Sequence, residues 1–150
     1  MQWILFQYSV PNKPSKLRVY IWRKLKALRS EQLTEGLYAL PLTEKTIEQL
    51  QWLSAEVEEM NGEAILWRAE CLSAKQEEEL IALFRRKAAE GYDRIRELLA
   101  QIPDDASYRV WLDSIIRQYA DIRYHDYFDT ARDHAIHTQL EQHYRNRGGH

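Results

Sequence analysis

The chain has 150 residues, a formal net charge of −2 and one cysteine, Cys71. A single cysteine excludes an internal disulfide framework and any metal site built from several cysteines. No apolar run is long enough to span a bilayer, and the first residues lack the basic and apolar regions of a secretory signal. We therefore expect a soluble cytoplasmic protein without a membrane partner, built as one domain or as a small domain with an appended helical segment.

The first 72 residues predict strands alternating with helices. The stretch from Trp3 to Val10 is rich in aromatic and branched residues, and its first part, Trp3-Ile4-Leu5-Phe6, is apolar on both faces, which indicates an interior strand. Turn and capping residues then separate a helix over 14–29, a hairpin over 32–40, a helix from Thr43 to a stop at Asn61-Gly62, and a strand over 64–69. This order is typical of a ferredoxin-like βαββαβ sheet, in which right-handed crossovers place both helices on one face.

The remaining residues, 73–150, show helical periodicity. A capping-box pattern at Ser73 opens a long helix, and two more helices follow Pro103 and Asp129. Gly91 lies inside the long helix and indicates a kink or a close contact. No flexible linker separates the two parts, so we predict an α+β fold in which about three helices pack on the core within one structural domain.

Basic residues are concentrated near the amino terminus. The first thirty residues contain seven Lys and Arg and no Asp or Glu, which leaves 14 basic and 23 acidic residues for the rest of the chain. Six of the seven lie in the helix 14–29, whose apolar residues Leu17, Ile21, Leu25 and Leu28 form the buried stripe. A basic helix face suits DNA phosphate, another oxyanion or an acidic partner, and the alternative is a solvated face balanced by acids elsewhere in the chain.

Several short motifs of the chain follow one another in a familiar order. They are Tyr8-Ser9-Val10-Pro11, Arg18, Trp22-Arg23-Lys24-Leu25, Glu35-Gly36-Leu37-Tyr38-Ala39-Leu40-Pro41, Gly62-Glu63-Ala64 and, later, Asp126-Tyr127-Phe128. In this order they resemble the N-terminal domain of the chromate-resistance regulator ChrB. The resemblance implies a role in the transcriptional response to chromate, either as a regulator of a chromate-efflux operon or as an accessory to one. It also implies a further C-terminal domain in full-length members.

A looser resemblance links the strand-Pro-helix pattern to the middle domain of PaaX-type repressors and to small ferredoxin-fold CRISPR-associated nucleases. It leads to an alternative, a nucleic-acid-processing protein on the same fold. Such enzymes usually place an Asp at the end of the first strand to hold Mg²⁺, whereas this strand ends in Tyr8-Ser9-Val10-Pro11. A second alternative is a homodimerisation module that uses an exposed sheet edge or the helical tail.

Candidate residues for binding DNA, or a chromate- or sulfate-like oxyanion, follow from the basic helix. They are Arg18, Trp22, Arg23, Lys24, Lys26 and Arg29, with Arg85 and Arg86 as a second basic row on the long helix. Two rows that face each other would form an anion pocket. The competing interpretations are that Trp22 is half-buried against the second helix, and that Arg85 and Arg86 lie on an exposed face paired with glutamates at helical spacing.

Catalysis and cofactors find no support in the sequence. There is no phosphate-binding glycine loop, nucleophile elbow or Cys-His pair of known spacing, so we predict a non-enzymatic module without a cofactor. His134 and His137 have a spacing that can clasp zinc, but the nearby Asp and His residues follow no familiar signature, so we predict no metal site. Cys71 follows a predicted strand and is interpreted as a small core residue.

Overall fold

The computed structural model describes residues 1–129 and 132–148, and within this range it leaves out the side chains of 132–134 and 147–148. The chain forms two compact units, Met1–Leu80 and Ile81–His150, and each is described by itself. The boundary lies inside the long helix α3 (Ala74–Ala100). The predicted packing of the helical part on the sheet therefore stays a prediction.

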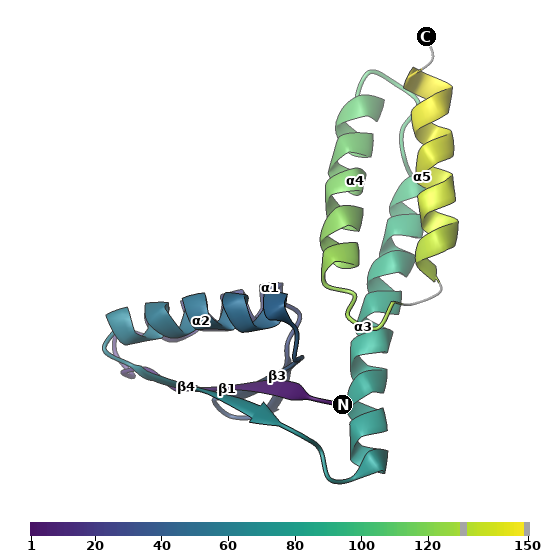
Figure 1. Cartoon of the computed structure of the whole chain (residues 1–150). Coiled ribbons are helices and arrows are strands. Elements are labelled where there is room, and N and C mark those ends of the chain that lie inside the picture. The colour runs from purple at the N-terminus through teal and green to yellow at the C-terminus, as the bar shows by residue number, and fades with distance from the viewer. Residues whose placement is uncertain (130–131, 149–150) are drawn as a thin grey trace. The chain divides into compact units, whose positions relative to one another are not determined.

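The first unit contains a four-stranded sheet (Figure 1). Its strands are β1 (Trp3–Ser9), β2 (Glu31–Thr34), β3 (Leu37–Pro41) and β4 (Glu63–Ala69). They lie in the order β2-β3-β1-β4, and every neighbouring pair is antiparallel. The expected interior position of β1 is confirmed, since β3 and β4 flank it. The element order of strand, helix, two strands, helix and strand is confirmed as well.

Two helices, α1 (Lys16–Ala27) and α2 (Glu44–Glu59), cover one face of this sheet (Figure 1). The buried residues of α2, Leu50, Leu53 and Val57, recur at helical spacing, and Ile21 and Leu25 do the same in α1. The fully buried Phe6 is paired with Tyr38 on β3 and with Leu66 on β4. These residues therefore share the side of the sheet that the helices cover.

Capping residues fix where the two helices begin and end. At the start of α2, the Thr43 hydroxyl accepts a 3.0 Å hydrogen bond from the Thr46 amide, and the Thr46 hydroxyl accepts a 2.9 Å bond from the Thr43 amide. At the end of α2, Asn61 has a φ of 62° and the Gly62 amide donates back to the Val57 carbonyl. This is a Schellman motif.

The same motif ends α1 earlier than predicted. Arg29 has a φ of 58°, its amide donates to Lys26, and the Ser30 amide donates to Leu25. The expected helix 14–29 is therefore corrected to Lys16–Ala27, with Arg29 beyond its end. A left-handed conformation is costly for a residue with a β-carbon, and the two backbone hydrogen bonds offset that cost.

Glycines occupy two positions where strands and turns come close together. A β-carbon on Gly36, which has a φ of 74°, would lie 2.8 Å from the Tyr8 carbonyl oxygen. A β-carbon on Gly62 would lie 2.5 Å from the Ser9 carbonyl oxygen. Both contacts are too short for any side chain, so these glycines let the β2–β3 turn and the end of α2 approach the end of β1.

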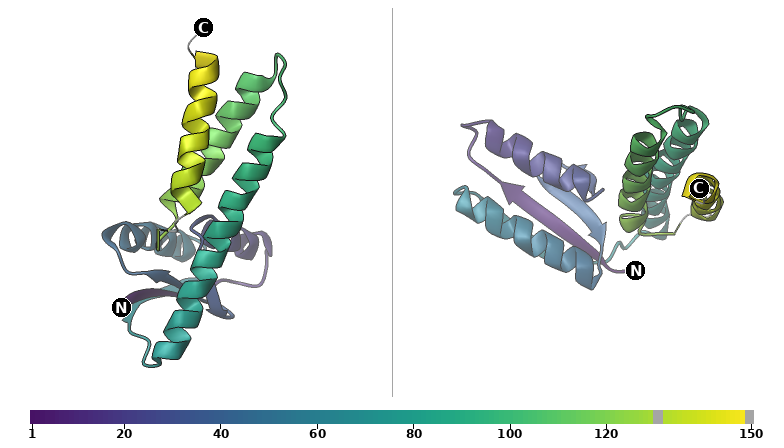
Figure 2. Two further views of the ribbon diagram at one scale, coloured as in Figure 1. Left: turned by 90° about the vertical axis from the view of Figure 1, so that its right-hand side faces the viewer. Right: turned by 90° about the horizontal axis from the view of Figure 1, so that it is seen from above.

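The second unit is a helical bundle formed by α3 together with α4 (Tyr108–Tyr124) and α5 (Arg132–Gly148), which run side by side in Figure 2. The three helices expected after residue 72 are thus present. Their shared core consists of Ala88, Tyr92, Ile95, Leu99, Tyr108, Leu112, Ile115, Tyr119, Ile122, Ile136 and Leu140. Gly91 marks a close contact, since a β-carbon there would meet the Ile122 side chain at 3.2 Å. No helix in the described part of the chain is long and apolar enough to cross a bilayer.

Candidate anion-binding face of helix α1

The predicted row Arg18, Trp22 and Lys26 lies along one side of α1. The residues are four apart, so they stack on one side of the helix. Lys26 Nζ lies 4.9 Å from the centroid of the Trp22 ring, and Trp22 exposes 46% of its surface. About half of the Trp22 surface is therefore buried, and the expected packing of its ring against the second helix stays a prediction. The ring supports a cation at the surface.

A second row of the same kind was missed in the sequence. Lys16, Tyr20 and Lys24 are also four apart, and Lys24 Nζ lies 5.4 Å from the centroid of the exposed Tyr20 ring. The signal was present in the i, i+4 spacing of a cation, an aromatic ring and a second cation. Arg23 is exposed between the rows. We call these seven residues the basic face of α1: Lys16, Arg18, Tyr20, Trp22, Arg23, Lys24 and Lys26.

Most cations of the basic face have no acidic partner among the residues that the structure describes. Among the described residues, no carboxylate lies within 4.0 Å of the charged groups of Arg23, Lys24 or Lys26. Arg18 differs, because its Nη2 lies 3.3 Å from Glu35 Oε1. Both of these side chains are largely exposed, so the pair contributes little to stability, but it reduces the local positive charge. Arg29 lies beyond the helix end and has its own interactions, so it does not continue the helical row, and its part in anion binding stays a prediction.

Residues of the early motifs meet where β1 ends. The Tyr8 amide donates a 2.9 Å hydrogen bond to the Gly36 carbonyl, and the Tyr8 and Tyr38 rings lie 6.1 Å apart between centroids. The Tyr8 and Tyr38 phenol groups interact with each other. Burial raises the pKa of Tyr8 above its usual 10.0, and the nearby Arg18 guanidinium partly opposes this. These contacts place the β2–β3 turn, and with it Glu35, next to α1.

Arg85 and Arg86 belong to the second unit, so the predicted joint pocket with α1 stays a prediction. Arg86 Nε lies 3.9 Å from Glu90 Oε1, four residues along α3. This pair confirms, for Arg86, the interpretation of an exposed residue paired with a glutamate at helical spacing. The Arg85 guanidinium carbon lies 5.8 Å from the centroid of the Phe128 ring.

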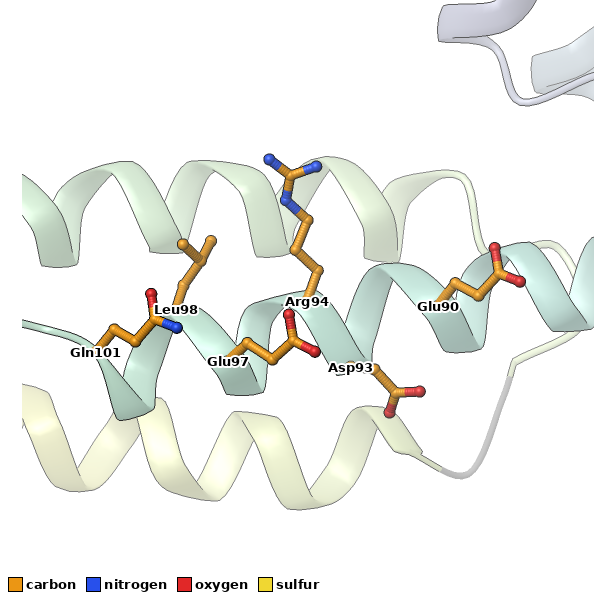
Figure 3. Close-up of a pocket in the computed structure, with 6 residues that line it drawn as sticks. All are labelled: Glu90, Asp93, Arg94, Glu97, Leu98 and Gln101. Atoms are coloured by element: carbon orange, nitrogen blue, oxygen red, sulfur yellow. The ribbon is translucent and has the colours of Figure 1, made fainter.

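A cavity of about 520 Å³ opens along α3 in the second unit (Figure 3). Its lining residues all come from this helix: Glu90, Asp93, Arg94, Glu97, Leu98 and Gln101. Three carboxylates and one guanidinium give the lining a net negative charge, and Arg96 approaches Asp93 at 3.9 Å. A dianion such as chromate is repelled by such a lining, so this cavity does not supply the predicted anion pocket.

The structure also describes most of the weaker candidates of the sequence. Cys71 is partly buried, and its thiol donates to the Ser73 carbonyl at 3.4 Å. His137 Nε2 lies 3.2 Å from Glu141 Oε1, whereas the side chain of His134 lies outside the described residues. In the described part of the chain, no group of three or more His, Cys, Asp or Glu side chains is placed to hold a metal ion.

Over its described residues, the chain is a mixed α/β protein with a four-stranded antiparallel sheet, five helices and an exposed cationic helix face. The chain belongs to the family described as "Protein ChrB, N-terminal", which matches residues 18–117, from the basic face of α1 into α4. The likeness expected from the early motifs is thus confirmed.

A curated relative, "Protein ChrB" of Cupriavidus metallidurans (strain ATCC 43123 / DSM 2839 / NBRC 102507 / CH34), is 32% identical over 84 residues. The aligned part covers 56% of this chain and 26% of the relative, so the chain spans about a quarter of that protein's length. No solved structure matches the chain.

Proposed function

We propose that this protein is a regulatory component of chromate resistance and that the basic face of α1 contacts the phosphate backbone of DNA. Membership of the ChrB family supports the pathway. One observation supports the contact: Arg23, Lys24 and Lys26 are exposed and have no carboxylate within 4.0 Å among the described residues. Cations that are not neutralised within the chain are available to an external anion.

The shape of the basic face favours a long polyanion over a small oxyanion. Arg18 and Lys26 are eight residues apart, which is about 12 Å along a helix axis. Their charges spread over a convex surface, whereas a tetrahedral dianion needs several donors that converge on one point. Phosphate groups repeat along a nucleic-acid strand and match a row of separated cations.

The aromatic rings contribute by holding the cations at the surface. A lysine side chain loses conformational entropy when it binds a phosphate. Lys26 already lies over Trp22 and Lys24 over Tyr20, so part of that loss occurs before binding. Contacts between these cations and DNA phosphates supply affinity but do not select a base sequence, because phosphate groups are the same at every base.

The sheet provides the support for this helix. In the proposed architecture the first unit is a ferredoxin-like βαββαβ sheet that holds α1 by Ile21 and Leu25. The opposite side of the helix then remains free for DNA. Transcriptional regulation is the proposed outcome of this contact. The proposed role is non-enzymatic, in which the helix surface positions charge for binding.

The experiment is DNA binding by fluorescence anisotropy with the full chain and a labelled duplex from upstream of a chromate-efflux operon. The variant Arg23→Gln/Lys24→Gln/Lys26→Gln removes three unpaired cations and keeps residues that favour helix. The matched control, Lys75→Gln/Arg94→Gln/Arg117→Gln, removes the same charge from exposed positions on α3 and α4. We expect the α1 variant to bind at least tenfold more weakly and the control to bind within about threefold of the wild type.

Equal losses in the two variants would contradict the proposed site, because they would report net charge alone. Sodium sulfate and sodium chloride are compared at matched ionic strength in the same titration. Equal weakening by the two salts is expected for phosphate binding. Selective displacement by sulfate would instead favour a small-oxyanion site on this face.

A further inference from the structure

The two edges of the sheet in the first unit differ in how well they are protected. The edge strand β2 has four residues and a register shift against β3. The edge strand β4 has seven residues, holds an unbroken register with β1, and contains no proline or glycine. Natural sheets block unwanted pairing with short, bulged or proline-containing edges. By these criteria β2 is blocked and β4 is a template for another strand.

The outer side of β4 has no partner in the described part of the chain. Its ladder with β1 uses one side of the strand, and no backbone hydrogen bond from another described segment reaches 63–69. In an antiparallel edge strand about half of the N–H and C=O groups point away from the sheet. These groups lie along an almost uncharged strand whose only charged residues, Glu63 and Arg68, lie near its ends.

Two large apolar side chains of β4 are exposed on the sheet face opposite α1 and α2. Ile65 and Trp67 expose 47% and 50% of their surfaces. They are paired with Gln7 and Leu5 of β1, and Trp67 Nε1 donates a 2.9 Å hydrogen bond to Gln7 Oε1. That bond holds the indole on this face. An exposed Ile and Trp beside an unpaired edge are typical of an interface.

We propose that β4 pairs antiparallel with β4 of a second copy, centred on Leu66, to form a continuous eight-stranded sheet. In this register Ile65 of each copy lies opposite Trp67 of the other, which joins the four exposed side chains into one cluster. Glu63 lies opposite Ala69 and Ala64 opposite Arg68, so no like charges face each other. All seven residues of β4 take part, and a shift by two residues would lose ladder pairs at both ends.

The occupant is a second copy because the strand is complementary to itself. Antiparallel pairing about a two-fold axis is isologous and stops at two chains. It leaves only the β2 edges free, and these are the short, bulged ones. Residues directly opposite in an antiparallel pair project to the same side, so the helices of both copies cover the same face of the joined sheet. This pairing is independent of DNA binding.

The first test is the mass of the full chain in solution by light scattering after size exclusion. We expect twice the 17.9 kDa chain mass at micromolar concentration. The variant Ile65→Lys/Trp67→Lys places four ammonium groups around the two-fold axis and is expected to be monomeric, with an unchanged circular dichroism spectrum. Trp52→Lys changes a tryptophan of α2 that is exposed by 70% and is expected to stay dimeric. A monomeric wild type, or a dimeric Ile65→Lys/Trp67→Lys variant, would overturn the proposal.

A second test reads the register directly and does not depend on the charged variant. In a Cys71→Ser background, Leu66→Cys places two thiols opposite each other at the axis, within the range of a disulfide. Ala64→Cys is the matched control, because it projects to the same side of β4 but lies about 13 Å from its copy in this register. Oxidation is expected to link the Leu66→Cys chains and to leave the Ala64→Cys chains unlinked. A link in neither variant, or only in the control, would overturn the Leu66-centred pairing.

Discussion

The phenol of Tyr92, which is fully buried in the helical bundle, donates a 2.8 Å hydrogen bond to Oδ2 of Asp126 just after α4. Phe84 contacts the two residues that follow, with ring centroids 6.0 Å from Tyr127 and 5.7 Å from Phe128. The Asp126-Tyr127-Phe128 motif therefore fastens the segment after α4 to α3.

Replacement of Tyr92 by Phe tests this role. The change leaves the ring in place and removes one hydrogen-bond donor to the partly buried Asp126 carboxylate, so we expect the free energy of unfolding to fall by about 1–3 kcal/mol. Urea denaturation of the full chain, followed by circular dichroism, measures the change. Tyr144→Phe, at an exposed tyrosine of α5, is the control and should change stability by less than about 0.5 kcal/mol. Equal effects of the two substitutions would contradict the role of the Tyr92 hydrogen bond.

Glu35 is expected to weaken anion binding by α1, because its carboxylate lies 3.3 Å from Arg18. The variant Glu35→Gln removes the negative charge and frees the guanidinium for a phosphate. We expect DNA affinity to rise about two- to fivefold, since an exposed ion pair is worth up to about 1 kcal/mol. Anisotropy titrations measure this. Glu44→Gln, at an exposed acid at the start of α2, is the control for net charge, and an equal gain there would argue against a specific Arg18–Glu35 effect.

Arg29 is a position where glycine should stabilise the chain. Its φ of 58° lies in the left-handed region, which costs a residue with a β-carbon about 1 kcal/mol. We expect Arg29→Gly to raise the free energy of unfolding by up to about 1 kcal/mol. Any stabilising contacts of the Arg29 side chain that are lost would reduce this gain. Gly36→Ala, at a φ of 74° and 2.8 Å from the Tyr8 carbonyl, should do the opposite and destabilise the chain clearly. Thermal melts of both variants provide the comparison, and a destabilised Arg29→Gly would show that side-chain contacts outweigh backbone strain.

Alkaline pH is expected to destabilise the first unit through Tyr8. Burial raises the pKa of Tyr8 above 10.0 in the folded chain, so the folded state holds this proton more tightly than the unfolded state does. The contribution of Tyr8 to the free energy of unfolding is fully present below pH 10 and is lost as the pH rises through the folded-state pKa. Tyr8→Phe should therefore show a shallower loss of stability above pH 10. Urea midpoints on both sides of pH 10 test this, and parallel losses in the two proteins would rule out Tyr8 as the cause.

Much of the fold was predictable because its signals are local. Pro11, the Thr43 cap and Asn61-Gly62 mark where elements begin or end, and the structure has its boundaries close to them. The end of α1 was not predictable, because Arg29 occupies a left-handed position that usually contains glycine. Only the backbone hydrogen bonds from Arg29 to Lys26 and from Ser30 to Leu25 reveal it.

The sequence predicts which side chains of α1 carry the charges of the candidate site, but not which residues elsewhere in the chain contact them. The i, i+4 rows of α1 are visible in the sequence, including the missed row through Tyr20. The approach of Glu35 to Arg18 depends on the β2–β3 turn, which is placed by pairing between residues far apart in the chain. Helical periodicity also does not predict how much of the Trp22 ring is exposed, because this exposure depends on how closely α1 and α2 pack.

The salt dependence of DNA binding tests the central claim most directly. If the cations of α1 neutralise phosphates, the logarithm of the association constant falls linearly with the logarithm of the salt concentration, with a slope of about −0.9 per phosphate contacted. The account predicts that this slope becomes less negative by roughly two to three in the α1 variant Arg23→Gln/Lys24→Gln/Lys26→Gln. In the control variant Lys75→Gln/Arg94→Gln/Arg117→Gln, the slope should stay within about one of the wild-type slope. Identical slopes in the wild type and the α1 variant would contradict it.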